Sequence, residues 1–577
     1  MRASYDRGLK TKLAVAVTLL GSFAVACNAL LDFDAYRVEP ADGGSPEGAS
    51  ADDGGTADDG GCIDPAGFGG RGCFRCTPTT NDELLGACTS SQFEAFDNAA
   101  RIVGFDASDP RPALGDGGTT PAPFPPPATV DGGVAQGECD LNVPNPVMVL
   151  GATGFPMETV AKALGPTGGA PAAATIFYRE ESSCVGAANA LLNNRKLGGA
   201  DPARNVVVKY DSVSGAGTKC ILSDEHPADI NLSALFLESC AGSVDGLGDN
   251  PSLPADVVDF LGPVNPVMLA TPSTSTEKVI SAEAAYRVYG FKESGVAPWL
   301  DENYIFRRTD TSANQQTVAR SLGLPIGELR GRDSRGSSNM KVALQSSDAP
   351  DKTIGISASE IVDINRDVLK TLAYQHYNQP VGFYPDSAPG ASDRRNVRDG
   401  HYYLWIPLHV LARVSAGDPV AASGNAILDA ITPKVQRDAA VKQLVLVMVS
   451  RLEPVVKSVN YLAALKQVGN VPQCAMQVTR AKEGAPLQSF APTTRCGCAF
   501  EATFPGTAPP ECQSCTDSST CPTERPTCSF GYCEQLRGGP LIRGARLAPY
   551  PRQVSARFVG RLRHRRDSCL ILWSRSS

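Results

Sequence analysis

Histidine is scarce in this sequence, positive charge is not in excess, and the residue orders of familiar covalent catalysts are missing. The five histidines are few beside 18 cysteines, so we predict no mixed metal site. A formal net charge of −8 argues against a nucleic-acid partner. No Ser-His-Asp order and no Cys-His nucleophile pattern stands out, so we predict neither an enzyme nor a cofactor.

The N-terminus lacks an apolar run long enough to cross a membrane comfortably. The run from Leu13 to Ala26 is short, follows four basic residues and ends in small residues before Cys27, as an export signal does. It resembles a bacterial lipoprotein signal, although Ala24 stands where leucine is commoner. The resemblance implies that residues 1–26 are removed and that lipidated Cys27 anchors the chain to the inner or outer membrane, facing the periplasm or cell surface. The alternative is an ordinary secretory signal cleaved after Ala26.

Charge is unevenly distributed, and both ends of the mature chain are predicted to be unfolded. Residues 27–61 are acidic and rich in glycine without apolar periodicity, which predicts a solvated tether. Residues 535–577 hold ten arginines, no lysine and one acidic side chain, so this tail carries +9 and the rest of the chain −17. We predict a disordered tail; a reading-frame artefact and binding to an anionic surface are the alternatives.

Abundant cysteine with little histidine indicates disulfides formed in an oxidising compartment. Without Cys27 and Cys569, sixteen cysteines remain, an even number that could pair completely. We expect small disulfide-rich segments at 62–104 and 496–534, with zinc as the less favoured alternative in each. Between the first segment and the body, residues 105–141 form a linker whose proline and glycine exclude helix and strand.

The body of the chain alternates strands, loops and helices, which predicts an α/β fold. The continuous apolar run at 147–150 predicts a strand buried on both faces, and 157–164 has helical spacing. The same order of strand, Gly-rich loop and helix is predicted to recur from the strand 205–210 and the loop 211–218, and a third short strand is predicted at 229–232. We expect a largely parallel sheet whose strand-end loops converge on one crevice. Later elements are predicted as strands at 264–271, 304–306, 353–356 and 401–411, and as helices at 281–291, from 336 and within 421–465.

A polar loop at 308–315 separates the short strand 304–306 from a helix. Its Thr, Ser and Asn residues offer hydroxyls and unpaired backbone N–H groups where the helix dipole favours negative charge. Arg308 adds a fixed cation that can make a bidentate contact. The sequence therefore predicts an oxyanion cradle, and the alternative is a simple capped helix, since these residues are also preferred N-caps.

Three loops together resemble those of the type-2 periplasmic substrate-binding proteins, and among them the phosphate-binding component of ABC importers. Residues 151–156 resemble its Gly-Ala-Gly-x-Thr-Phe-Pro loop with one residue fewer, 214–217 its Ser-Gly-x-Gly loop, and 308–314 its Arg-Ser-Asp-Gly-Ser-Gly-Thr loop. The likeness covers about residues 142–470 and rests on order and spacing. It implies that Asp310 orients Arg308. The ligand contacts that it implies are Thr153, Phe155, Ser214, Arg308, Ser312, Ala313 and Asn314.

The resemblance also implies an architecture and an activity. Residues 142–263 and 401–475 would form one lobe and 264–400 the other, joined by two crossing strands and closing over the ligand at a hinge. The chain would bind a small, phosphate-like oxyanion outside the cytoplasm and pass it to an ABC permease.

One position departs from the family pattern. The family's Ser-Asp pair, whose carboxylate accepts the proton of protonated phosphate, is Ser233-Ala234 here. Its loss removes a physical basis for preferring phosphate to fully ionised sulfate. Asp229 lies on the wrong side of the strand end to replace it. Two alternatives follow: a surface structural or interaction lipoprotein that keeps the fold without transport, and a hydrolase on the same fold, which a phosphatase assay would reveal.

Overall fold

The computed structural model describes residues 62–115, 120–125, 137–166, 173–202, 204–451, 460–492 and 495–534. The predicted signal peptide, Cys27, the acidic tether and the Arg-rich tail lie outside these residues. Among the helices of the described residues, none combines the length and apolar character that crossing a membrane requires.

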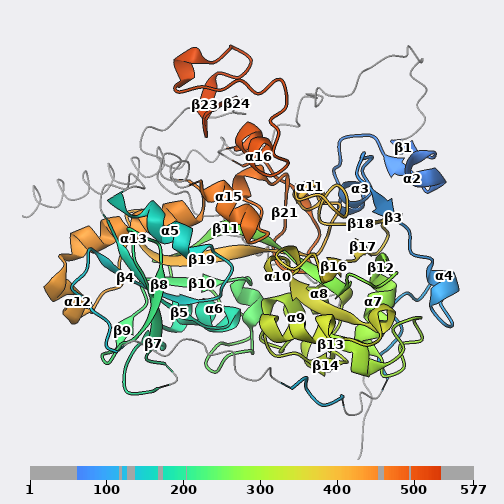
Figure 1. Ribbon diagram of the computed structural model, residues 1–577, viewed down its shortest axis with the longest axis horizontal. Coiled ribbons are helices and arrows are strands. Elements are labelled where there is room, and N and C mark those ends of the chain that lie inside the picture. The colour runs from blue at the N-terminus through green and yellow to red at the C-terminus, as the bar shows by residue number, and fades with distance from the viewer. Residues whose placement is uncertain are drawn as a thin grey trace, which may run out of the picture. The chain divides into compact units, whose positions relative to one another are not determined.

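A mixed sheet of twelve strands organises the described part of the chain (Figure 1). The order along its main path is β14, β13, β15, β11, β19, β10, β4, β5, β7 and β8, with β16 paired to β11 and β20 to β19. The bounds are β4 Pro146–Gly151, β5 Thr175–Glu180, β7 Val206–Tyr210, β8 Gly217–Ile221, β10 Ile230–Ser233, β11 Val257–Pro272, β13 Ile305–Arg307, β14 Arg332–Asp333, β15 Ile354–Ala358, β16 Leu369–Thr371, β19 Trp405–Ser415 and β20 Asp418–Pro419.

Two long antiparallel strands, β11 and β19, connect the two sides of the sheet. They pair from Val257 opposite Arg413 to Pro266 opposite Trp405. On one side β19 pairs with β10, and on the other β11 pairs with β15. We call β10, β4, β5, β7 and β8 the β4 half of the sheet, and β15, β13 and β14 the β15 half.

The β4 half begins as the sequence predicts. All six residues of β4 are buried, and helix α5 (Met157–Ala163) follows its Gly-rich loop. The strand pairs in parallel with both β5 and β10, so the loops after all three lie at one edge of the sheet. Gly151 ends β4 with φ of +135°, and a Cβ there would lie 2.0 Å from the carbonyl oxygen of Leu232, so only glycine fits.

The prediction of a largely parallel sheet is wrong at the loop that holds Ser214. Strand β7 runs antiparallel to β5, and the loop turns into the hairpin strand β8 rather than into a helix. The Asp211 side chain explains the turn, because its Oδ1 accepts hydrogen bonds from the backbone of Val213 and from both the backbone and the hydroxyl of Ser214. Strand β5 and the helix after it, α6 (Ser183–Leu192), were not predicted from the sequence.

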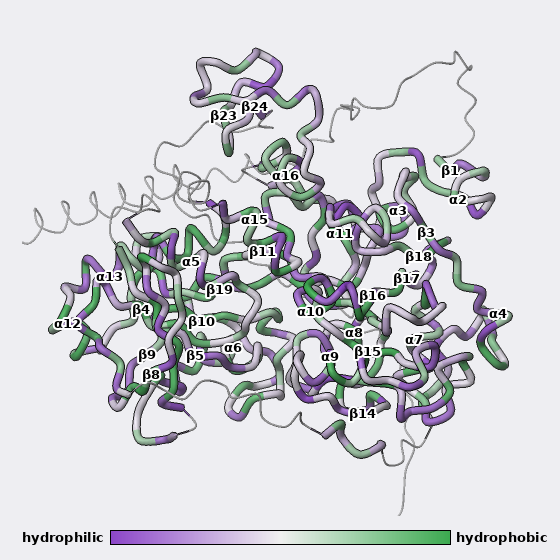
Figure 2. The backbone as a smooth tube through the Cα atoms, in the orientation of Figure 1, coloured by the Kyte–Doolittle hydropathy of each residue, from purple (hydrophilic) through white to green (hydrophobic). Residues whose placement is uncertain are grey.

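The β15 half agrees well with the predicted elements. The helix predicted at 281–291 is α7 (Ala282–Gly290), and the polar loop leads into α8 (Ala313–Leu322). Two further helices, α9 (Ser337–Gln345) and α10 (Ser359–Asp363), flank β15 in sequence. Apolar residues dominate strands such as β4 and β19, and green stretches along these strands are visible in Figure 2.

After β19 the chain returns to the β4 half, where the predicted helices are present. They are α12 (Ala426–Ile431), α13 (Lys434–Met448) and α15 (Tyr461–Gln467), and α13 packs against β4 and α5 (Figure 1). Arg437 of α13 is fully buried and reaches Asp229 at the start of β10, with 2.9 Å between Nη2 and Oδ1. The second oxygen of Asp229 accepts the backbone N–H of Met148, so Asp229 fastens β4 to β10.

His376 follows strand β17 (Ala373–Gln375) and lies in the core, stacked at 3.6 Å on Tyr403. Burial lowers the pKa of its imidazole from 6.5 to about 3. Between pH 6.5 and about pH 3 the unfolded chain binds a proton at His376 that the folded chain excludes. The neutral His376 therefore contributes to the free energy of unfolding above pH 6.5, and this contribution is lost as the pH falls toward 3. We expect a His376→Phe variant, which keeps a stacked ring, to lose less stability between pH 7 and pH 4 in urea unfolding. Equal losses in both proteins would contradict this assignment.

Eight disulfides pair all sixteen cysteines that were predicted to pair. In the N-terminal segment they join Cys62 to Cys76 and Cys73 to Cys88, which confirms disulfides over zinc. This segment is docked on the body, because its strand β3 (Phe93–Glu94) pairs with β18 (Gly382–Phe383).

The described parts of the predicted linker are held against the body. The ring of Phe124 packs edge-on against Phe306, and its backbone N–H donates to Asp333. The hydroxyl of Tyr286 donates to the carbonyl oxygen of Pro112. No helix or strand forms in residues 105–115 and 120–125, as the proline content predicts.

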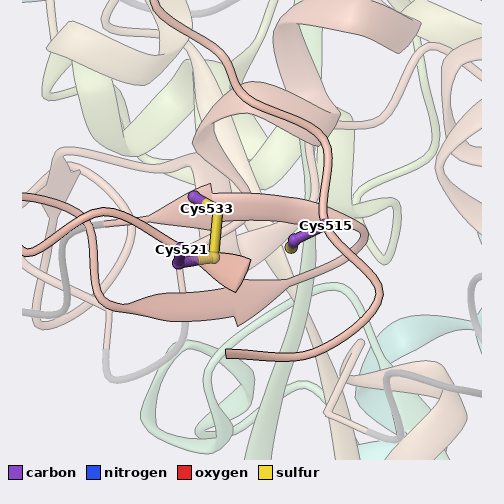
Figure 3. A group of neighbouring side chains, drawn as sticks. All are labelled: Cys515, Cys521 and Cys533. Carbon is purple, nitrogen blue, oxygen red and sulfur yellow. A yellow bond between two sulfur atoms is a disulfide. The ribbon is translucent and has the colours of Figure 1, made fainter. Parts of the chain in front are cut away.

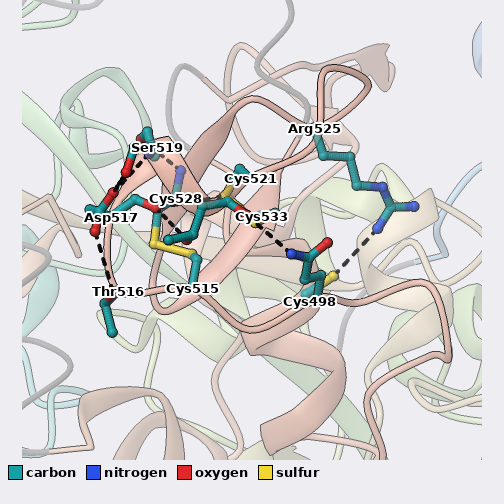
Figure 4. The surroundings of a disulfide bond; sticks show 12 residues. Cys498, Cys515, Thr516, Asp517, Ser519, Cys521, Arg525, Cys528 and Cys533 are labelled. Carbon is teal, nitrogen blue, oxygen red and sulfur yellow. Dashed lines mark hydrogen bonds between the residues drawn. A yellow bond between two sulfur atoms is a disulfide. The ribbon is translucent and has the colours of Figure 1, made fainter.

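The C-terminal module is also built on disulfides. Cys515, Cys521 and Cys533 lie close enough together to suggest a metal site, but Figure 3 shows Cys521 bonded to Cys533, and Figure 4 shows Cys515 bonded to Cys528. Sulfurs in disulfides are not thiolate ligands. An additional bond from Cys474 to Cys496, which the sequence grouping did not anticipate, ties the module to the body.

Candidate functional site

A cavity of about 460 Å³ lies where the loops after β4, β5 and β10 meet the loop before α8. Its walls therefore come from both halves of the sheet. Thr153, Ser182 and Ser183 line it from the β4 half, and Arg308, Ser312, Ala313 and Asn314 line it from the β15 half. The apolar part of the wall is formed by Ala152, Ala234, Ala358, Ile406 and Leu408.

Arg308 is the only cation in the wall of this cavity among the described residues. It is half-buried, and its Nη1 donates to the hydroxyl of Ser337 at 2.9 Å, which fixes the guanidinium. Its Nε is buried without a hydrogen-bond partner among the described residues. Burial lowers the pKa of the guanidinium, and the negative charges of Glu360 and Asp333 oppose that shift. An arginine stays protonated even so, and it therefore has a spare donor for an anion.

Helix α8 presents its N-terminus to the cavity. Ser312 is the N-cap residue, and its side chain makes no capping hydrogen bond, so the hydroxyl remains available. The first backbone N–H groups of a helix have no partner within it, and the helix dipole favours negative charge there. Ser312, Ala313 and Asn314 all line the cavity at this end.

Helix α6, which was not predicted from the sequence, presents a second N-terminus to the same cavity. Ser182 is its N-cap residue and, like Ser312, makes no side-chain capping bond. Ser182 and Ser183 line the cavity directly after β5. The sequence does carry a signal for this strand and helix. Residues 175–178 are β-branched or aromatic, as in a strand, and the two serines that come after them precede a run of small residues, as at the start of a helix.

Glu360 lies in the cavity wall and carries negative charge toward Arg308. Its Oε2 accepts a hydrogen bond from Asn265 of β11 at 3.1 Å. Burial raises the pKa of its carboxyl above the usual value, and the Asn265 bond and the charge of Arg308 oppose that shift only in part. Two further carboxylates, Glu180 and Glu181, line the wall, and Glu181 is paired with Arg179.

A second cavity of about 590 Å³ adjoins the first, because five residues line both: Thr153, Glu180, Arg308, Ser337 and Glu360. Phe155 lines this second cavity rather than the first, and so does Arg335. The two cavities together bring Thr153, Phe155, Arg308, Ser312, Ala313 and Asn314 into one region, as the family resemblance implies for these positions.

Two predicted site residues lie elsewhere. Ser214 sits in the exposed β7–β8 turn, bonded to Asp211, and lines neither cavity. Asp310 does not contact Arg308: its Oδ1 lies 3.3 Å from Nη1 of Arg307 and accepts a bond from Gln315. Gln315 in turn accepts the backbone N–H of Arg308 at 2.9 Å, so any influence of Asp310 on Arg308 passes through Gln315.

Ala234 lines the cavity at the position where the family has its carboxylate. Asp229 does not replace that group, because it is fully buried against Arg437 and the backbone of Met148 and Ala422. The carboxylate of Glu360 is in the cavity instead. It comes from the opposite half of the sheet, so no sequence pattern near residue 234 could have indicated it.

No protein-family model matches the chain, and no curated protein matches its sequence. Solved structures that match part of this chain weakly include a putative phosphate ABC transporter substrate-binding protein with bound phosphate from Clostridium perfringens, at 16% identity and a TM-score of 0.31, covering 52% of this chain and 98% of that one. An ABC-type phosphate transport receptor from Vibrio cholerae has 13% identity and a TM-score of 0.29, covering 47% and 88%. The OxyR regulatory domain from Pseudomonas aeruginosa has 10% identity and a TM-score of 0.27, covering 52% and 97%. Likenesses this weak carry no argument about function, which must come from the site.

Proposed function

We propose that this protein binds a small, phosphate-like oxyanion between the two halves of its sheet. The observation that carries the proposal is the meeting of two helix N-termini, α6 and α8, at one cavity beside Arg308. Neutral N–H and O–H donors with one guanidinium hold an oxyanion without needing a second full charge. The proposal contains no catalytic step.

The wider role follows from the same proposal. The β4 and β15 halves act as two lobes that close over the ligand about β11 and β19. The chain is an extracytoplasmic lipoprotein, anchored through Cys27, that delivers the oxyanion to an ABC permease. The eight disulfides support an oxidising compartment, as this location requires.

Isothermal titration of the full chain with phosphate, sulfate and arsenate tests this proposal. We expect saturable binding of at least one of the three anions, with one ligand per chain. If none binds at millimolar concentration, the proposed function is wrong.

Glu360 is expected to set the preference among these anions. A carboxylate in the cavity repels a fully ionised anion and accepts the proton of a protonated one. In a Glu360→Gln variant, we expect the affinity for sulfate relative to phosphate to rise about tenfold, since removing one nearby like charge changes binding by roughly 1–2 kcal/mol. Titrations at pH 7.5 measure the ratio, and Glu225→Gln, on the surface beside Lys196, is the control. An unchanged ratio would remove Glu360 from this role.

A second candidate function is a surface interaction protein that keeps this fold without transport. One feature favours it: Glu483, from the segment after the body, is buried and bonds to the backbone of Phe236 and the hydroxyl of Ser239 in the β4 half. The next residue, Gly484, packs against the backbone of Arg320 in α8 of the β15 half. A segment held by both halves opposes their relative motion. An Arg308→Ala variant distinguishes the two functions. Loss of anion binding in the variant supports the first, whereas a wild-type chain that binds no anion and a variant that keeps its partner binding would favour this candidate.

A further inference from the structure

We propose that the natural ligand carries a positively charged group as well as its oxyanion, as an aminoalkyl phosphate or phosphonate does. This inference rests on the proposed function, because it names the ligand class of the same site. It comes from the balance of charge around the first cavity, from the room in it and from the spare donor on Arg308.

The first cavity has more carboxylates than an anion alone would need. Its charged side chains are Arg308, Glu180, Glu181 and Glu360. Glu181 is neutralised by Arg179, whereas neither Glu180 nor Glu360 has an ion-pair partner within 4 Å in the part of the chain that the structure describes. One guanidinium therefore faces two unpaired carboxylates. A simple anion would satisfy Arg308, and a protonated one would also donate to Glu360, but Glu180 would be left repelling it.

The buried Nε of Arg308 points to a ligand independently of the carboxylates. It has no hydrogen-bond partner among the residues that the structure describes, and an unpaired buried donor is unfavourable unless a ligand supplies an acceptor. The oxyanion supplies that acceptor beside the α6 and α8 N-termini. An ammonium group on the same ligand donates to Glu180 and Glu360, which border both cavities together with Arg308.

The cavity also has room for more than an inorganic ion. Its volume of about 460 Å³ lies within the range of roughly 300–1,000 Å³ that holds small organic molecules. Ile406 and Leu408 supply apolar wall between the polar loops, which suits a short alkyl chain linking the two charged groups.

Titration of the full chain with inorganic phosphate, ethyl phosphate and 2-aminoethyl phosphate tests the inference. We expect 2-aminoethyl phosphate to bind at least tenfold more tightly than ethyl phosphate, which has a similar size and no amine. In Glu180→Gln, the difference in affinity between 2-aminoethyl phosphate and ethyl phosphate should fall below threefold. Ethyl phosphate should bind as well as before or better, because one repelling charge is gone. Glu225→Gln, outside both cavities, should keep the wild-type difference.

The outcomes separate this inference from the proposed function. Equal binding of ethyl and 2-aminoethyl phosphate, or a difference that survives in Glu180→Gln, would overturn the inference while the oxyanion site stands. If none of the three compounds binds at millimolar concentration, the proposed function fails, and the inference fails with it.

Discussion

An Arg308→Ala variant is expected to bind its oxyanion at least about 100-fold more weakly than the wild-type chain, because a half-buried charged donor is removed from the cavity wall. The Nη1 of Arg308 donates to Ser337, and its Nε has no hydrogen-bond partner among the described residues, so no described neighbour replaces the guanidinium when it is removed. Isothermal titration with phosphate measures the loss, and the melting temperature shows whether the fold is intact.

Arg413→Gln is the matched control for this variant. Arg413 lies near the end of β19 and pairs with Asp256 at the surface, outside both cavities. We expect it to bind phosphate within threefold of the wild type. A similar affinity in Arg308→Ala and wild type would mean that the anion binds elsewhere.

The largest expected effect on stability comes from Arg437. Its side chain and that of Asp229 are both 0% exposed, and removing one partner of a buried pair costs about 3–5 kcal/mol because the other charge is left unpaired. An Arg437→Met variant keeps the length of the side chain and leaves Asp229 uncompensated between β4 and β10. We expect its free energy of unfolding in urea, with disulfides intact, to fall by about that amount.

The same Arg413→Gln control applies, because a surface ion pair contributes about 0–1 kcal/mol. Arg437→Met should bind phosphate normally at temperatures where it is folded, since Arg437 lines neither cavity. If the free energy of unfolding of Arg437→Met falls by less than about 1 kcal/mol, the buried Arg437–Asp229 ion pair contributes no more than a surface ion pair does.

The loop at Arg308 could be predicted because its signals are local. A short apolar strand is followed within fifteen residues by polar N-cap residues and then by helical spacing. This order indicates where a strand ends and a helix begins, and β13 and α8 form there. The position of Ser312 and Asn314 at the start of α8 follows from the helix N-terminus alone. Nothing distant is needed to place these groups at a strand's carboxyl end.

Ser214 shows where local signals failed. A Ser-Gly-x-Gly sequence suits both a loop before a helix and a tight hairpin turn, and Asp211 decides for the turn by binding Ser214. The helix N-terminus that lines the cavity follows β5 instead, where Glu180 and Glu181 interrupt the pattern and no glycine marks the loop. The sheet's mixed direction depends on such hairpins, so it could not be read from strand positions.

The contacts of Glu360 and Glu483 could not be predicted from neighbouring residues either, for a different reason. Each joins its partners across a long stretch of chain, Glu360 to Asn265 and Glu483 to Ser239. Their positions depend on how β11 and β19 bring the two halves together. The sequence shows that residue 234 is alanine and has no carboxylate. It does not show that the carboxylate of Glu360 lies in the cavity wall on the opposite side.

A crystal structure of the full chain grown with millimolar phosphate tests the central claim most directly. We expect the anion within hydrogen-bonding distance of Arg308 Nε, between the N-termini of α6 and α8. An empty cavity under those conditions, or an anion bound only away from Arg308, would contradict the account.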